Sequence, residues 1–299
     1  MDLDLKRIRY FLKVSETLNF SSAARHFRVS QPALTKAIQR LENDIGGALI
    51  RREGRNTHLT PLGSAMLDRF RSYDASASAV EQTARNLVHG EMPRLRLGIM
   101  CTIGPTPLAG FMASYQASAP NLEIVLHDTT LMELSDILMS GMVDIAFVGA
   151  ARINAGRFRY QDLYREPMVA VCAPQHRFAH YQSISIEEVL RERFVDRLDC
   201  EFRDTFLLEA HNRDFEPMYV ARSDKEDWAQ GLVRAGVGVT IAPAYSIAPD
   251  LVKIPLSDMQ VERTVSIAVP IGREDTEVIR AFLRAARAHP WTTPPEQSR

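Results

Sequence analysis

Residues 20 to 45 contain two short amphipathic segments separated by a break at Arg28 and Val29, and few folds accommodate that arrangement. The apolar residues of the first segment recur at the spacing of one helical face: Phe20, Ala23, Ala24 and Phe27. Those of the second segment do the same: Leu34, Ile38, Leu41 and Ile45. Ser21 and Ser30 are candidate N-caps, and Pro32 suits a first helical turn. The pattern predicts two short helices joined by a tight turn.

The second segment leaves a polar and basic face exposed. A helix pair of this kind is a helix-turn-helix. Its second helix fits the major groove of DNA, about 12 Å wide, where glutamine pairs with adenine and lysine with guanine. We therefore expect double-stranded DNA as a partner, contacted by Ser30, Gln31, Pro32, Thr35, Lys36 and Arg40. The alternative is an ordinary helix pair with a solvated basic face.

Residues 49–59 predict a small hairpin after the two helices. Two strand-like runs flank a turn at residues 53–56, where Gly54 suits the backbone. Arg52 and Arg55 on this wing would meet the DNA backbone or a narrow minor groove, where the negative potential favours arginine.

Several motifs resemble, in order and spacing, the signature of LysR-type transcriptional regulators. The matching runs are Ala23-Ala24, Ser30-Gln31-Pro32-Ala33-Leu34-Thr35-Lys36, Arg40-Leu41-Glu42, Leu49-Ile50-Arg51-Arg52 and Leu59-Thr60-Pro61-Leu62-Gly63. Ile50 stands where the family usually has phenylalanine, and Thr35-Lys36 stands where it often has Ser-Arg. The DNA bases that relatives prefer therefore cannot be transferred to this chain. The resemblance implies an α/β fold class with an N-terminal all-helical winged helix-turn-helix (residues 1–60), a linker helix and a two-lobed, periplasmic-binding-protein-like effector-binding domain.

The charge of the chain is divided between its two ends. Residues 1–60 hold eleven Lys and Arg against six Asp and Glu, a net +5, and the remainder holds 25 against 31, a net −6. A basic head on an acidic body indicates that the head meets phosphate. Because the N-terminus lacks an export signal and no apolar run approaches a membrane span, we expect a cytoplasmic protein without a membrane partner.

The chemistry-bearing residues do not form a metal or catalytic motif. The three cysteines are widely separated, which argues against a disulfide framework or a metal knuckle. His176 and His180 are four residues apart but lack a third ligand. We expect no metal, no cofactor and no enzymatic activity.

Residues 61–88 predict one long linker helix that begins after the Thr60-Pro61 cap. Its apolar residues follow a heptad seam: Met66, Phe70, Tyr73, Ala77, Val80, Ala84 and Leu87. About 27 residues at about 1.5 Å each give a rod of roughly 40 Å. The alternatives are a coiled coil between two copies and a helix packed on its own domain. The family resemblance implies a homodimer through this helix, assembled into a homotetramer, on a pseudo-palindromic operator.

After a predicted hinge at residues 89–93, residues 94–299 alternate between strand and helix patterns. Strand-like runs are 95–99, 122–126, 143–148, 168–172 and 237–242, and helical runs are 107–117, 132–140, 202–211 and 225–235. This alternation predicts an α/β body with mostly parallel sheets. The resemblance implies two lobes, 94–164 with 266–299 and 165–265, with crossings near residues 164–165 and 263–264.

An effector is expected at the carboxyl ends of the strands, beside helix N-termini. The candidate residues are Cys101, Thr102, Ile103, Thr130, Gly149, Ala150, Cys200 and Arg203. Threonine hydroxyls and exposed N–H groups there would hold a small effector such as an organic anion, although each threonine alone suits a helix cap. Arg203 would bind an anion or, more simply, pair with Glu201 or Asp204. The resemblance implies that the effector switches DNA binding or bending.

Cys200 offers a different reading. Peroxide-sensing members of the family place a reactive cysteine before a helix in the second lobe, and a helix N-terminus favours the thiolate. Asp199 and Glu201 oppose it by charge repulsion, and no cysteine follows Cys200 to resolve a disulfide. Cys101 is far from Cys200 in the sequence, and the alternative is that both loops border the same cleft. Redox sensing is therefore the alternative function; a solute-binding protein and a cysteine peroxidase are remote ones.

Overall fold

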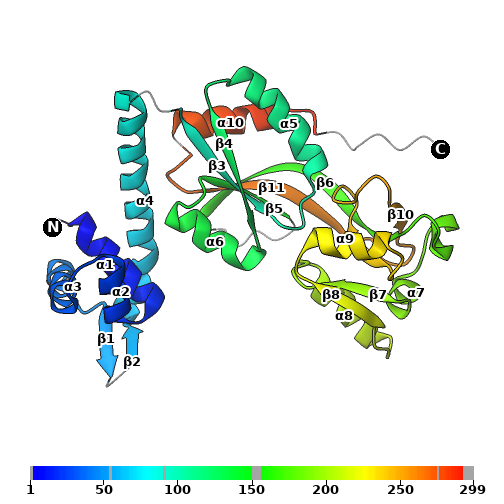
Figure 1. Cartoon of the computed structure of the whole chain (residues 1–299), viewed down its shortest axis with the longest axis horizontal. Helices are drawn as coiled ribbons and strands as arrows, with labels where there is room; N and C mark the ends of the chain where they lie inside the picture. Colours follow the sequence, from blue (N-terminus) through cyan, green and yellow to red (C-terminus); the bar gives the residue numbers. More distant parts are fainter. Residues whose placement is uncertain (1–2, 54–55, 90–91, 150–155, 275, 292–299) are drawn as a thin grey trace. The chain divides into compact units, whose positions relative to one another are not determined.

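A computed structural model describes residues 3–53, 56–89, 92–149, 156–274 and 276–291 (Figure 1). Two predicted site residues, Arg55 and Ala150, lie outside the described residues, as do residues 90–91 of the predicted hinge and the tail at 292–299. The N-terminal part and the α/β part form two separate compact units.

The N-terminal unit contains α1 (Leu5–Thr17), α2 (Phe20–His26), α3 (Gln31–Ile45), the antiparallel hairpin β1 (Ile50–Glu53) and β2 (Asn56–Leu59), and α4 (Pro61–His89). Ser30 caps α3, its Oγ accepting from the N–H of Ala33 at 3.3 Å. Asn19 caps α2 and accepts from the N–H of Ser22 at 2.9 Å. The prediction that Ser21 caps this helix is wrong, because Ser21 already lies within it.

The core of this unit joins α1 and α3 to the first turns of α4. Its buried members are Ile8, Phe11, Leu12, Leu41, Leu49 and Phe70. The rings of Phe11 and Phe70 meet edge to face with centroids 5.5 Å apart. Phe70 therefore packs inside its own subunit, and the early part of the heptad seam is covered. The later seam positions Tyr73 and Val80 remain 47% and 69% exposed.

The first lobe of the α/β unit contains β3 (Arg94–Met100), α5 (Pro105–Ser118), β4 (Glu123–Thr129), α6 (Leu131–Ser140), β5 (Ile145–Gly149) and α10 (Glu277–Ala288). Strand β3 is parallel to β4 and β5. Helices α5 and α10 cover one side of the sheet, and α6 lies on the other (Figure 1). Phe111 and Phe282 from the two covering helices pack edge to face, 5.1 Å between centroids, in the lobe's core.

The second lobe follows a long strand, β6 (Phe158–Cys172). It contains η1 (Arg177–His180), α7 (Ile186–Arg191), β7 (Phe194–Arg197), α8 (Arg203–Asn212), β8 (Tyr219–Ser223), α9 (Glu226–Arg234), β9 (Thr240–Pro243) and β10 (Val252–Pro255). Strands β7 and β8 pair parallel to each other, whereas β9 and β10 pair antiparallel to β6.

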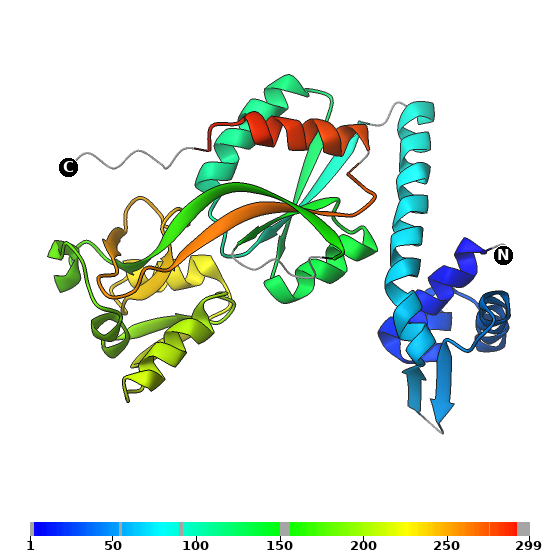
Figure 2. The ribbon, with the colours of Figure 1, turned by 180° about the vertical axis from the view of Figure 1, so that it is seen from behind.

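Two long antiparallel strands, β6 and β11 (Glu262–Pro270), form a ribbon that connects the lobes. Strand β11 pairs with β6 along its whole length, and the two run side by side from one lobe to the other (Figure 2). The seven-stranded sheet has the order β10-β6-β11-β5-β3-β4, with β9 also on β6. The prediction of mostly parallel sheets is therefore wrong. Strand β11 pairs antiparallel to both β6 and β5, and β9 and β10 pair antiparallel to β6. The alternating strand and helix patterns of the sequence gave no indication of these antiparallel pairs.

Candidate functional site

A buried ion network lies where the two lobes meet the connecting strands. Arg263 on β11 and Glu166 on β6 are directly opposite each other in the strand pairing. Arg263 Nε donates to Glu166 Oε1 at 2.8 Å, and Nη1 donates to Glu201 Oε1 at 2.5 Å. The same Nη1 donates to Thr102 Oγ1 at 2.7 Å, and Nη2 donates to the Thr102 carbonyl at 2.8 Å. One guanidinium thus joins the first lobe, the second lobe and the ribbon between them.

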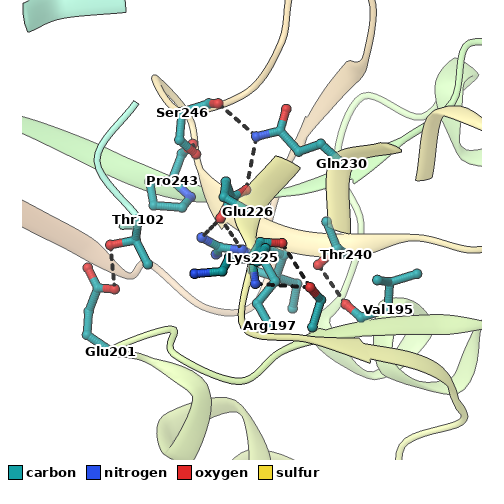
Figure 3. Close-up of polar contacts among 12 residues, drawn as sticks. Thr102, Val195, Arg197, Glu201, Lys225, Glu226, Gln230, Thr240, Pro243 and Ser246 are labelled. Carbon is teal, nitrogen blue, oxygen red and sulfur yellow. Dashed lines mark hydrogen bonds and ion pairs between the residues drawn. The ribbon is translucent and has the colours of Figure 1, made fainter. Parts of the chain in front are cut away.

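Glu201 completes the network. Thr102 Oγ1 donates to Glu201 Oε2 at 3.0 Å, a contact drawn in Figure 3. The side chains of Arg263 and Glu166 are fully buried, and that of Glu201 is almost so. Burial opposes the charge on Arg263, but the neighbouring Glu201 and Glu166 outweigh it and hold its pKa above the usual value. Two carboxylates share one guanidinium, so the network carries an excess negative charge.

Glycine makes this close approach possible. A β-carbon at Gly149, the last residue of β5, would lie 2.8 Å from both Arg263 Nη1 and Glu201 Oε1. At Gly104, a β-carbon would lie 2.3 Å from the Cα of Ser246, across the lobes. Gly149, expected to border an effector, instead makes room for the ion network.

A cavity of about 840 Å³ opens beside the network. Its walls come from the loop after β3, the first turns of α5, the end of β4, the start of α6, the loop after β7, the start of α9 and residues 246–249. Apolar side chains line part of it: Ile99, Ile103, Leu108, Met112, Leu126 and Ile247. This volume suits a small molecule.

Polar contacts fix the wall that the second lobe supplies. Arg197 Nε donates to Glu226 Oε2 at 2.7 Å. Gln230 Nε2 donates to Glu226 Oε1 at 2.9 Å and to the Ser246 carbonyl at 2.8 Å. These side chains tie β7, α9 and the segment after β9 together (Figure 3). Gln230 also accepts a hydrogen bond from the N–H of Ala248 at 2.9 Å. The polar groups of the Gln230 side chain are therefore all paired within the cavity wall.

The predicted effector residues differ in whether they line the cavity. Cys101, Ile103 and Thr130 line the cavity. Thr102 is buried in the ion network beside it. Arg203 pairs with the buried Asp196, at 2.7 Å between Nη2 and Oδ2, and does not line the cavity. Its expected salt bridge exists, but the predicted partners Glu201 and Asp204 are wrong because Asp196 presents both oxygens to the guanidinium.

Several lining residues were absent from the sequence-based set. They are Glu133, Asp224, Lys225, Glu226 and Gln230, together with residues 246–249. Strand β8, which precedes α9, was not predicted, so the rule that ligands gather at the carboxyl ends of strands was not applied there.

The three cysteines differ in surroundings but not in the direction of their pKa shifts. Burial raises the pKa of Cys101 to about 11, with Asp199 adding to the effect and Arg197 opposing it. Burial also raises the pKa of Cys200, although Arg197 lowers it, and it raises that of Cys172 to about 11. Cys101 and Cys200 line the same small pocket. At neutral pH these groups are thiols, which are weak nucleophiles.

The exposed face of α3 forms the second candidate site. Pro32, Lys36 and Arg40 lie four residues apart, so they share one face of the helix, and all three are exposed. Within the described residues, neither Lys36 nor Arg40 makes a hydrogen bond or an ion pair. Gln31 is also exposed, and its Oε1 accepts from Ser21 Oγ at 3.2 Å. Backbone pairing places Arg52 in β1, opposite Thr57.

The arginines of α1 are already paired. Arg7 Nη1 lies 2.6 Å from Asp44 Oδ2, and Arg9 Nε lies 2.5 Å from Asp74 Oδ1. Elsewhere, the described side chains contain no group of three or more His, Cys, Asp and Glu placed to hold a metal ion. Of the helices that the structure describes, none combines the length and the apolar character needed to cross a bilayer.

A winged helix-turn-helix joined through a long helix to a two-lobed α/β domain with a ligand-sized cavity defines a class: bacterial DNA-binding transcriptional regulators with an effector domain. The chain matches the LysR substrate binding domain over residues 89–291 and the bacterial regulatory helix-turn-helix protein model of the lysR family over residues 5–64. It therefore belongs to the LysR family. Its fold class, predicted from the sequence motifs, is confirmed.

Individual relatives cover nearly the whole chain. It is 26% identical over 282 residues to the transcriptional dual regulator GltC of Bacillus subtilis, covering 91% of this chain and 92% of the relative. It is 24% identical over 279 residues to the DNA-binding transcriptional dual regulator OxyR of Escherichia coli, 90% of each.

Solved structures are similar at the level of the fold. A full-length OxyR variant from Pseudomonas aeruginosa has a TM-score of 0.67 at 22% identity and covers 100% of this chain and 99% of its own. Full-length CbnR complexed with its target DNA has a TM-score of 0.59 at 21% identity, with 95% and 99% covered.

Proposed function

We propose that this LysR-family regulator reads a pseudo-palindromic operator with α3 of paired subunits and changes its DNA binding or bending when a small effector enters the inter-lobe cavity. The observation that carries the proposal is that one chain contains both sites. The basic face of α3 is exposed to solvent, and a cavity of about 840 Å³ lies between the lobes of the effector domain.

The proposed DNA contacts lie on α3 with its N-cap and on the wing. Ser30, Gln31, Pro32, Thr35, Lys36 and Arg40 belong to the first set, and Arg52 and Arg55 to the second. Lys36 and Arg40 are the strongest candidates, since their charges have no partner within the described residues. Major-groove readout needs such free donors.

Self-association is proposed through α4. Tyr73 and Val80 lie seven residues apart and are exposed, so they form an apolar stripe on one face of the helix. A second copy of α4 would cover this stripe, and paired recognition helices would then meet paired half-sites. In this proposal residues 1–60 bind DNA, residues 61–88 pair two subunits and residues 94–299 bind the effector. Residues 89–93 are the hinge. The cytoplasm, where the bacterial chromosome lies, is the proposed location.

The test compares two lysines of the N-terminal unit. An operator is first selected from random duplexes with the purified full-length protein. Lys36→Ala should weaken binding to that operator about tenfold, because one good base contact is worth about 1–3 kcal/mol. Its effect on random DNA should be smaller. Lys13→Ala removes the same charge from α1, where Lys13 pairs with Glu16 at 2.8 Å, and should change neither affinity much.

Two results would count against the proposal. If the protein selects no sequence in dilute salt, DNA reading is excluded. If Lys36→Ala and Lys13→Ala lose affinity equally on every duplex, then α3 supplies only charge. The switch is tested separately, by footprinting with and without a ligand that binds the cavity.

Thiol-based sensing is the second candidate, and one observation favours it: Cys101 and Cys200 line the same small pocket. The raised pKa values of both thiols oppose it, because a peroxide-reactive cysteine needs the thiolate. The small-effector proposal therefore ranks first.

A further inference from the structure

Two anion-binding groups beside the cavity, Arg263 and the Thr102 hydroxyl, are already occupied by the protein's own carboxylates. Arg263 gives its donors to Glu166, Glu201 and Thr102. The Thr102 hydroxyl donates to Glu201. The Glu201 carboxylate, which belongs to the chain itself, thus occupies the position in which an anionic effector would accept hydrogen bonds from these donors. Arg263 and the Thr102 hydroxyl are therefore not available to an organic anion.

The free charges that face the cavity are mostly negative. Asp128 and Glu133 come from the first lobe, and Asp199, Asp224 and Asp227 from the second. All five are exposed, and Glu133 accepts from Thr130 at its own helix start. The other four carboxylates make no hydrogen bond or ion pair within the described residues. Glu226 also lines the cavity, but Arg197 neutralises it.

Positive contributions to the cavity are fewer. Among the described lining residues, Lys225 is the one cationic side chain. The N-termini of α5, α6 and α9 also reach the lining, and each contributes roughly half a positive charge. Five carboxylates without an ion-pair partner in the described part of the chain, set against Lys225 and these three helix ends, leave about two and a half negative charges. The raised pKa of Cys101, to which burial contributes most and Asp199 next, is consistent with this field.

We propose that the effector of this cavity is a small organic cation, an amine or guanidinium on a short apolar chain. The inference rests on the proposed function and specifies its ligand. The apolar chain would lie along Ile99, Leu126 and Met112, and the cationic ends would meet Asp128 on one lobe and Asp199 on the other. A dication that engages both lobes contacts both walls at once, so its binding energy depends on the angle between them.

The test uses two probes of equal chain length and opposite charge with the full-length protein. Agmatine carries a guanidinium and an amine on a four-carbon chain, and adipate carries two carboxylates on the same chain. Calorimetric titration should show agmatine binding and no adipate binding up to about 10 mM, a range in which a millimolar Kd is measurable. Agmatine binding should weaken with added salt, because exposed charges are screened.

Charge-removal variants locate the site. Asp199→Asn and Asp128→Asn should each weaken agmatine binding about fivefold, the upper range for a single exposed ion pair. Both residues are exposed and unpaired, so the variants should fold. Asp204→Asn is the matched control, because Asp204 is also exposed on the second lobe but does not line the cavity, and it should leave the affinity unchanged.

Three results would overturn the assignment of a cation to this cavity. They are tighter binding of adipate than of agmatine, no binding of agmatine, and an equal loss of agmatine affinity in the Asp204→Asn control. The proposed function is judged apart from it, on the selected operator: adipate that binds and shifts the footprint would reject the cation and keep the effector switch. Agmatine that binds through Asp199 and Asp128 yet leaves the footprint unchanged would keep the cation site and reject the switch.

Discussion

Replacing Arg263 by methionine should destabilise the α/β domain strongly, because it removes the shared partner of two buried carboxylates. The Arg263 guanidinium lies 2.6 Å from Glu166 and 2.5 Å from Glu201, and all three side chains are almost completely buried. Removing one partner of a buried pair costs about 3–5 kcal/mol, since the remaining charge is left uncompensated. For a domain of about 200 residues this corresponds to a fall in Tm of roughly 6–20 °C.

The informative comparison is Glu201→Gln. The network holds two carboxylates against one guanidinium, so removing the Glu201 charge leaves a balanced pair of Arg263 and Glu166. The amide oxygen still accepts from Arg263 Nη1, and the change should cost no more than about 1.5 kcal/mol. We therefore expect a large loss for Arg263→Met and a small one for Glu201→Gln.

Tryptophan fluorescence during urea unfolding measures the difference in the intact chain. Both tryptophans of the sequence, Trp228 and Trp291, belong to the α/β domain, so their signal does not report the DNA-binding unit. Trp228 is 68% exposed on α9, whereas the ring of Trp291 lies 5.0 Å from that of Phe111 in the first-lobe core. In a Trp228→Phe background the signal comes from Trp291 alone. If Arg263→Met then lost no more stability than Glu201→Gln, the charge count of the network would be wrong.

Three further predictions test other parts of the structure. Gly149→Ala should lower the free energy of unfolding by about 1–3 kcal/mol, the usual cost of overpacking, measured by the same urea titration; an unchanged midpoint would mean that the network relaxes freely. Cys200→Ser should leave the ligand-dependent footprint intact, and loss of a response to oxidant alone would instead favour thiol sensing. Val80→Glu should shift the protein toward a lower oligomer in sedimentation velocity, because it places charge in the exposed stripe of α4; unchanged assembly would exclude that stripe as an interface.

The DNA-binding unit was largely predictable because its signals are local. Helical spacing placed Leu34, Ile38 and Leu41 inside, and these side chains are buried in α3. Gly54 between two strand-like runs predicted the hairpin that β1 and β2 form. The heptad count predicted one long helix, but it could not tell that Phe70 packs on α1, because period alone does not say which partner covers a face.

The ion network was not predictable in the same way. Thr102, Glu166 and Glu201 meet Arg263 from positions 161, 97 and 62 residues away in the chain. No spacing rule connects residues so far apart, and the antiparallel ribbon that brings two of them together was itself missed. The position of Thr102 after the first strand predicted that it lies near the cleft. The same position did not predict that it would bind Arg263. A threonine hydroxyl gives no sequence signal of what it will bind.

The location of the network decides how a ligand can act on the lobes. Glu166 and Arg263 sit opposite each other on β6 and β11, the strands that connect the lobes, so their pairing moves with the ribbon. The bonds from Arg263 to Thr102 and Glu201 reach outward, one to each lobe. A rotation that moves Thr102 on one lobe away from Glu201 on the other must lengthen at least one of them. A ligand that changes the lobe angle therefore works against these bonds, and Glu201→Gln, which weakens one, should lower the ligand concentration needed for the same change in the footprint.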